Sequence, residues 1–304
     1  MCSLRNIFRN IIAIVLSYSI ILSGQLKSRI SYISKNNIPL SIYFHNPDKK
    51  VFERVVKWFI KNGFQFISYD QFISVISNKQ VMNKAVFISF DDGYEDNVFN
   101  VLPVLEKYKI PAIFFISTKP VEDGFFWFHL AKNELKNSST KLTNLWFIPN
   151  QARVEKVKAL ENSCKNIDKP KAITITGLKK MAASAYIAFG NHTNDHVICT
   201  NCTDNELQEE LKGCANKLIF WVGEKYINSL AYPNGNYSEK TISLCKTLNI
   251  STAFTTIPIL ISPNTTLYTI PRMGILDKGV LAENLLHAFG LWQPIIKKLK
   301  RIYK

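Results

Sequence analysis

The chain has 304 residues, enough for one large domain or two small ones. Hydrophobic residues make up 47% and charged residues 20%, which excludes a disordered chain and indicates a folded core. The formal net charge of +15 calls for an oppositely charged partner or surface, but no nucleic-acid recognition motif accompanies it, so nucleic acid is not expected.

Residues 1–35 are predicted to form a hydrophobic, membrane-associated segment. Arg5 and Arg9 precede an apolar run over residues 11–22, and Lys27 and Arg29 follow it. The run is shorter than the roughly 20 residues that span a bilayer. It fits a signal peptide with a poor cleavage site, a monotopic anchor, or a packed helix. We expect a membrane-associated protein, held peripherally or by its N-terminus.

Residues 36–280 are predicted to form one domain, since no repeat or linker divides them. Near-continuous apolar runs separated by helical patterns indicate a parallel sheet covered on both faces. About seven or eight such units suggest a barrel with its chemistry at the carboxyl ends of the strands. Strands are expected at 38–44, 64–68, 85–90, 111–117, 186–190, 228–232, 251–256 and 268–270, and helices near 51–62 and 96–108.

Two segments depart from this alternation. Residues 125–176 begin with an aromatic cluster and continue with a Lys/Asn-rich helical pattern, so we interpret them as an insertion that walls or caps a groove. Residues 281–304 have apolar residues at helical spacing and a basic remaining face. This basic amphipathic helix either lies on an anionic membrane surface or packs on the barrel.

Two adjacent acids, Asp91 and Asp92, end the apolar run 85–90. Like charges at a strand end are unfavourable unless a cation lies beside them, and aspartate oxygens suit a divalent ion. The alternative is a simple turn, because Asp-Asp-Gly is favourable turn chemistry.

A pair of histidines, His192 and His196, follows the expected strand 186–190. If the segment turns helically, imidazoles four residues apart face the same side and reach one ion. Two histidines and one carboxylate, with a position left for water, make a hydrolytic metal site. Cys199 and Cys202 lack a second CxxC pair, so we interpret them as incidental thiols or, in an oxidising compartment, a disulfide.

Four motifs in this order resemble those of the polysaccharide deacetylases, the NodB-homology group of carbohydrate esterase family four. SFDDGYEDN (89–97) resembles their first motif, NHTNDH (191–196) their second and LAYPNG (230–235) their third. IYFH (42–45) is similar to the strand that opens the poly-N-acetylglucosamine deacetylase branch, to which the chain is closest.

The resemblance implies a distorted (β/α)7-type, NodB-like barrel that removes N-acetyl or O-acetyl groups from sugars of a surface polysaccharide or lipid-linked glycan. It assigns Asp91 as the general base and Asp92, His192 and His196 as ligands of one divalent ion. That ion is expected to be Zn²⁺, with Co²⁺ or Ni²⁺ as alternatives.

The remaining roles also follow from the resemblance. It gives the general acid to His45, with His287 as a rival that we assign to packing or the surface of the C-terminal helix. Substrate and oxyanion contacts fall to Tyr232, Pro233 and Asn234. Ala231 stands where the family has an arginine that holds the base, and Arg272 is our candidate substitute, or else part of a structural salt bridge.

The alternative function is a catalytically inactive glycan-binding barrel. The complete set of Asp91, Asp92, His192 and His196 argues against it, because a protein that only binds glycans has no use for a base beside a metal. A phosphoesterase is disfavoured by the lack of a second metal cluster and of phosphate-binding glycines.

Overall fold

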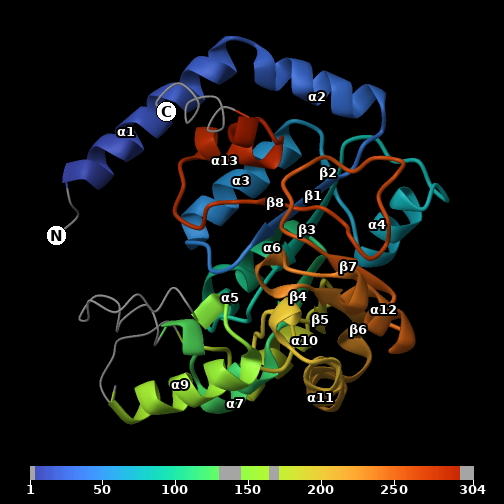
Figure 1. The fold of residues 1–304 in the computed structure, drawn as a ribbon. Coiled ribbons are helices and arrows are strands. Elements are labelled where there is room, and N and C mark those ends of the chain that lie inside the picture. The colour runs from blue at the N-terminus through green and yellow to red at the C-terminus, as the bar shows by residue number, and fades with distance from the viewer. Residues whose placement is uncertain (1–3, 130–144, 164–170, 295–304) are drawn as a thin grey trace.

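The computed structural model describes residues 4–129, 145–163 and 171–294, which fold around one curled parallel sheet (Figure 1). The strand order is β7-β6-β5-β4-β3-β1-β8, and β2 pairs with β3. Every pairing between these strands is parallel. The strands are β1 (Leu40–Phe44), β2 (Gln65–Phe66), β3 (Ala85–Phe90), β4 (Ala112–Ile116), β5 (Ile187–Asn191), β6 (Tyr226–Ala231), β7 (Thr252–Phe254) and β8 (Met273–Gly274).

One short segment nearly closes the sheet into a barrel. Ile270 forms a parallel bridge with Phe254 of β7, and three residues later Met273 pairs with Ile42 of β1. The chain therefore passes from one edge of the sheet to the other within residues 270–274. This is the distorted barrel that the sequence led us to expect.

Helices surround the sheet (Figure 1). They are α1 (Leu4–Leu22), α2 (Gln25–Lys35), α3 (Lys49–Lys61), α4 (Tyr69–Ile76), α5 (Asn97–Asn100), α6 (Leu102–Tyr108), α7 (Thr118–Asp123), α9 (Asn150–Ser163), α10 (Ile175–Ala182), α11 (Asp204–Val222), α12 (Glu239–Thr247) and α13 (Leu281–Ala288).

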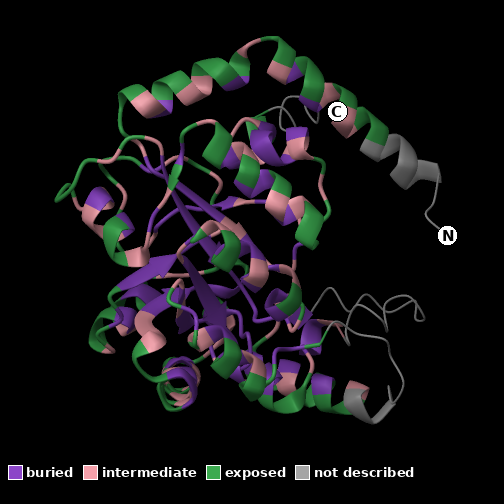
Figure 2. Cartoon of the chain, turned by 180° about the vertical axis from the view of Figure 1, so that it is seen from behind, coloured by how far each residue is buried: buried purple, intermediate pink, exposed green. Residues whose placement is uncertain are grey.

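Strand β3 shows why a continuous apolar run is needed at the centre of the sheet. All six of its residues are buried, and successive side chains point to opposite faces. Val86, Ile88 and Phe90 join the outer core beneath the helices, whereas Ala85 and Phe87 join a second cluster. Figure 2 shows most of the sheet buried while the helices expose their outer faces.

Several predicted elements differ from the structure. The expected strand 268–270 contributes only the bridge at Ile270, and the strand itself is β8. The expected helix 96–108 is divided into α5 and α6, because Pro103 in the first turn of α6 has no N–H to continue the earlier helix.

The prediction of one continuous helix over residues 281–304 is also wrong. Helix α13 ends at Ala288, and Gly290 takes φ +65°, a left-handed conformation that stops the helix. The basic residues 297–304 of that prediction lie outside the described residues. Parts of the predicted insertion, residues 130–144 and 164–170, lie outside them as well.

The N-terminal segment forms two helices that meet at Gly24, which has φ +81°. Among the described residues, no single helix has the length and apolar character to cross a membrane. The pair made by residues 11–22 and 25–35 reaches that length and composition together, although the two helices are bent by 60°.

Candidate active site

The predicted site residues come from neighbouring strands. Asp91 and Asp92 follow β3 directly, and His192 follows β5, with β4 lying between the two strands. Because the carboxyl ends of parallel strands lie at one edge of a sheet, these side chains converge there. Asp91, Asp92, His192 and His196 are all buried.

Asp92, His192 and His196 form a compact three-residue cluster. Their ligand atoms all lie within 4.8 Å of one another. The Nε2 atoms of His192 and His196 each lie 3.2 Å from the same oxygen, Oδ1 of Asp92. Two imidazole nitrogens and a carboxylate oxygen facing a common point are the donor set of a zinc site with a position left for water.

The histidines meet through a strained loop and not through the helical turn that would also place them on one side. Thr193 and His196 have φ of +63° and +46°, and Asp92, after β3, has φ +74°. Side-chain bonds fix the loop: Thr193 N–H donates to Asn191 Oδ1, and Val197 N–H donates to Thr193 Oγ1. Strain of this kind is typical of functional sites.

The protonation states of the three residues in the cluster favour the binding of a cation. Nδ1 of His192 lies 2.7 Å from the carbonyl oxygen of Ala231, which can only accept, so Nδ1 carries the proton and Nε2 presents a lone pair. Burial lowers the pKa of His196, which favours neutral imidazole. Burial alone would raise the pKa of Asp92, but the two imidazoles that lie 3.2 Å from its Oδ1 hold the pKa well below its usual value.

A buried oxygen atom without a hydrogen-bond donor also indicates that the cluster is suited to bind a cation. Oδ1 of Asp92 is buried, and no group in the described part of the chain donates a hydrogen bond to it. A buried carboxylate oxygen without a donor carries a desolvation cost that a bound cation removes. The three residues therefore fit one divalent ion.

The second acid, Asp91, is held by Arg272. Nη1 and Nη2 of Arg272 donate to the two carboxylate oxygens at 2.7 Å each. Arg272 is fully buried and also donates to Ser89 Oγ and to the carbonyl oxygen of Thr255. Burial alone would raise the pKa of Asp91, but the Arg272 charge, the neighbouring His192 and the hydrogen bonds from Arg272 together lower it. Asp91 is thus an ionised, oriented carboxylate beside the cluster.

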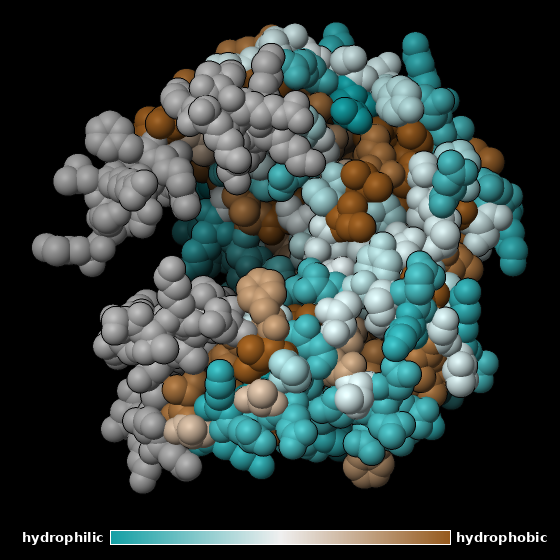
Figure 3. All heavy atoms as spheres, in the orientation of Figure 1, coloured by the Kyte–Doolittle hydropathy of each residue, from teal (hydrophilic) through white to brown (hydrophobic). Residues whose placement is uncertain are grey.

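A groove of about 1570 Å³ opens over these residues. Figure 3 shows this face of the molecule hollowed between its upper and lower parts. His45, at the end of β1, lines the groove and interacts electrostatically with Asp91, Asp92 and Asp277. Asp277 accepts the N–H of His45 at 3.2 Å. Sequence reasoning missed Asp277, because it has no motif around it.

His287 lines the same groove, but it lies against Trp292, with ring centroids 5.6 Å apart. Burial lowers its pKa to about 4. Of the two positions that we expected for His287, packing or the surface, the structure places it in a packed one.

The third motif contributes less to the groove than we predicted. Tyr232 is fully buried, and its hydroxyl donates to the carbonyl oxygen of Tyr268, so its side chain is a core element. Pro233 is buried beside it, and of the three residues only Asn234 lines the groove.

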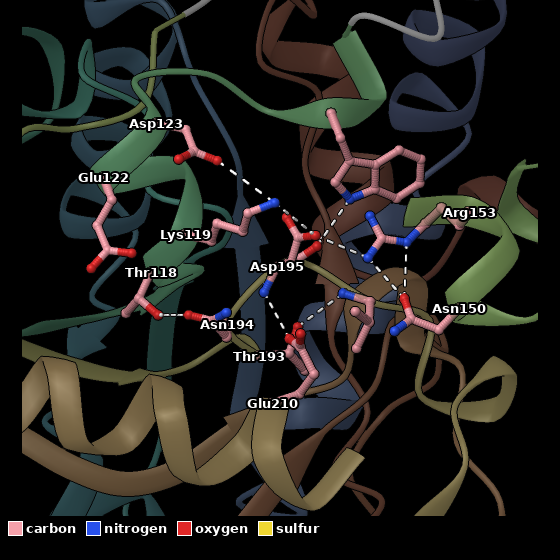
Figure 4. A network of polar contacts seen from close by, with 12 residues as sticks. Thr118, Lys119, Glu122, Asp123, Asn150, Arg153, Thr193, Asn194, Asp195 and Glu210 are labelled. Atoms are coloured by element: carbon pink, nitrogen blue, oxygen red, sulfur yellow. Dashed lines mark hydrogen bonds and ion pairs between the residues drawn. The ribbon is translucent and has the colours of Figure 1, made fainter. Parts of the chain in front are cut away.

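Residues of the insertion reach the groove and the histidine loop. Phe128 and Trp146 line the groove, and the Phe128 ring lies 4.8 Å from that of His196. Figure 4 shows Arg153 of α9 pointing at Asp195, which stands directly before His196 in the chain. Nη2 of Arg153 lies 2.9 Å from Asp195 Oδ2.

Glu210 of α11 holds the same loop from the other side. It accepts the N–H of Asp195 at 2.7 Å, and burial raises the pKa of Glu210 to about 7. Neither Arg153 nor Glu210 belongs to a motif, so sequence reasoning missed both.

Acids and imidazoles gathered at the carboxyl ends of barrel strands define the class of protein, a hydrolytic barrel enzyme. Residues 78–253 match the family model described as polysaccharide deacetylase, and the chain belongs to that family. The family resemblance seen in the motifs is confirmed.

Two relatives and one solved structure illustrate the match. YxkH of Bacillus subtilis is 24% identical over 228 residues, which are 75% of this chain and 64% of that protein. The poly-β-1,6-N-acetyl-D-glucosamine N-deacetylase of Staphylococcus aureus is 24% identical over 255 residues, covering 78% of this chain and 73% of the enzyme. The Streptococcus pyogenes deacetylase PplD in complex with acetate shares the fold, with a TM-score of 0.60, 20% identity, and coverage of 83% of this chain and 97% of that one.

Proposed function

We propose that the protein is a divalent-metal-dependent deacetylase that removes N-acetyl, or O-acetyl, groups from the sugars of a surface polysaccharide or lipid-linked glycan. The observation that carries this proposal is a carboxylate, Asp91, clamped by Arg272 directly beside the cluster of Asp92, His192 and His196. One group can act as base while the other three hold an ion.

Asp92, His192 and His196 would hold the ion, and when bound it supplies a Lewis acid for the acetyl carbonyl and lowers the pKa of water. Asp91 takes the proton of the attacking water, because its lowered pKa keeps it ionised at neutral pH. Arg272 orients that carboxylate through its two parallel hydrogen bonds.

His45 returns a proton to the departing sugar amine or alcohol. It follows β1, which pairs with β3, so acid and base reach the acetyl group from neighbouring strand ends. Asp277 acts as a positioning residue, since its carboxylate fixes the backbone of His45.

The substrate, an N-acetylated glycan, would lie along the groove. Phe128, Trp146 and Trp292 line it, and aromatic faces pack well against the apolar faces of sugar rings. The volume of about 1570 Å³ leaves room for several sugar units.

The test is acetate release from a panel of N-acetylated glycans by the purified protein loaded with Zn²⁺, Co²⁺ or Ni²⁺. We expect Asp91→Asn to abolish acetate release while retaining bound metal, because Asp91 is not a ligand. We expect His192→Ala to lose both. Asp204→Asn, an exposed acid in the first turn of α11, is the matched control and should keep both.

Unchanged turnover in Asp91→Asn would rule out the base. A wild-type protein that binds glycans but releases no acetate with any of the three metals would instead be the inactive glycan-binding barrel.

A further inference from the structure

The outer face of α1 is apolar and uncovered. Ile11, Val15, Tyr18 and Leu22 are 51%, 59%, 54% and 84% exposed. Their spacing of four, three and four residues places them on one face of the helix. A helix on the surface of a water-soluble domain normally presents polar residues on that face, and a continuous apolar stripe indicates a contact with something else.

The opposite face of α1 is part of the folded protein. Ser17 is fully buried, and Ile20 packs with Leu286 of α13 and with Trp292. Figure 1 shows α1 and α2 running across the top of the molecule above α13. Since α1 is fixed along the domain on one side, its apolar side can meet only a partner that lies flat against it.

The charge around this face identifies the partner. No acidic residue precedes Asp48, whereas five basic residues lie before it: Arg5, Arg9, Lys27, Arg29 and Lys35. Lys27 and Lys35 are exposed on α2. An apolar helix face whose neighbouring sequence carries positive charge and no acid is complementary to a bilayer that carries anionic headgroups.

The same helix borders the catalytic groove. Ile12, Ala13, Ile14 and Leu16 line the groove whose inner part holds Asp91, Asp92, His192 and His196. A surface bound by α1 would therefore lie beside the mouth of the groove.

We propose that α1 docks the protein on an anionic lipid bilayer, with its axis in the plane of the membrane and Ile11, Val15, Tyr18 and Leu22 in the headgroup region. The groove then opens at the membrane surface, within reach of a glycan held there by a lipid. The docking itself does not depend on the activity proposed above; only the consequence for the glycan rests on it.

The test uses the full-length chain and vesicles of phosphatidylcholine with or without phosphatidylglycerol. We expect the protein to sediment with the phosphatidylglycerol vesicles, and Val15→Asp/Leu22→Asp to reduce the bound fraction about tenfold, because two charges would enter the apolar face. Phe220→Asp is the matched control, since Phe220 is 85% exposed on α11 at the other end of the molecule. It should bind like the wild type.

A second measurement needs no disruptive change. Tyr18→Trp places a fluorophore on the docking face, and brominated phosphatidylcholine in the vesicles should quench its added fluorescence. The proposal is overturned if Val15→Asp/Leu22→Asp binds as well as the wild type, if Phe220→Asp loses binding equally, or if the added Trp is not quenched. Vesicle-bound protein that alkaline carbonate fails to release would contradict the in-plane orientation.

Discussion

At the scale of single residues, Arg272 holds Asp91 in place of the arginine that the family has at the position of Ala231. Ala231 cannot hold the proposed base, Asp91, and the arginine comes instead from the segment that closes the barrel, 181 residues along the chain from Asp91. Both members are almost fully buried, at 3% and 0% exposure of the side chain. Such a pair is costly to break from one side, by about 3–5 kcal/mol, because the remaining charge is left unpaired.

We expect Arg272→Met to move the acidic limb of kcat/KM to higher pH. Without the guanidinium, burial dominates and the pKa of Asp91 rises, so the base becomes protonated at a pH where the wild type is still active. Arg272→Lys keeps a charge but loses the two parallel hydrogen bonds. The acidic limb of its kcat/KM profile should therefore move less than that of Arg272→Met, while its kcat falls.

The measurement is the pH–rate profile of the three proteins on one soluble glycan. An acidic limb that stays in place in Arg272→Met would mean that Asp91 is not the titrating base. The same pair links pH to stability. A lowered pKa in the folded state means that Asp91 stabilises the fold above its unfolded pKa, and that this contribution is lost as pH falls through the folded pKa.

At the scale of elements, the insertion is coupled to the histidine loop through α9. Arg153 is 3% exposed, stacks over Trp127 at 4.7 Å, and pairs with Asp195. The Trp127 indole N–H donates to the carbonyl oxygen of the same residue, Asp195, at 3.0 Å. Asp195 stands next to His196, so these contacts fix the position of a proposed ligand from outside the cluster.

We expect Arg153→Ala to weaken zinc binding by about ten- to a hundredfold, the usual cost of losing a group that orients a metal ligand. Lys119→Ala is the comparison, because Lys119 contacts the same carboxylate at 3.5 Å but its side chain is 38% exposed, and exposed pairs contribute little. Competition with a chelator of known affinity measures both constants. Equal zinc affinity in the two variants would show that α9 does not orient the loop.

The sequence predicted the elements whose own residues form a clear apolar pattern. Strands β3 and β4 are continuous buried apolar runs, and both were found where expected. Strand β8 has only Met273 and Gly274, too few residues to show alternation, and it exists because β1 offers it a partner. The C-terminal helix was overextended, since one glycine, Gly290, ends a pattern that continues in the apolar spacing.

The sequence predicted the site residues that lie within short motifs. The Asp-Asp pair and the two histidines sit within short recognisable segments, and the barrel brings them together as the strand order requires. Asp277, Arg153 and Glu210 have no such segments, and their contacts join residues 15 to 232 positions apart. Only the packing of α9, α11 and the segment after β8 reveals them.

At the scale of the whole molecule, the net charge of +15 and the apolar face of α1 would act on the same partner in the docking that we propose. Charge attracts the protein to an anionic surface over about 10 Å at 0.1 M salt, and the apolar face holds it there at contact. Neither property should affect an uncharged oligosaccharide in solution, which meets the groove by diffusion alone.

We therefore expect salt to separate two substrates that carry the same sugar. Acetate release from an N-acetylglucosamine lipid in phosphatidylglycerol vesicles should fall severalfold as sodium chloride rises from low to high concentration, because screening weakens docking. Release from a neutral, soluble N-acetylglucosamine oligomer should stay constant across the same series, which also shows that salt leaves the catalytic centre intact. If acetate release fell equally on both substrates, salt would act at the catalytic site, and the surface charge would have no role in docking. If the protein were inactive on both substrates, the vesicle-binding experiment alone would test docking.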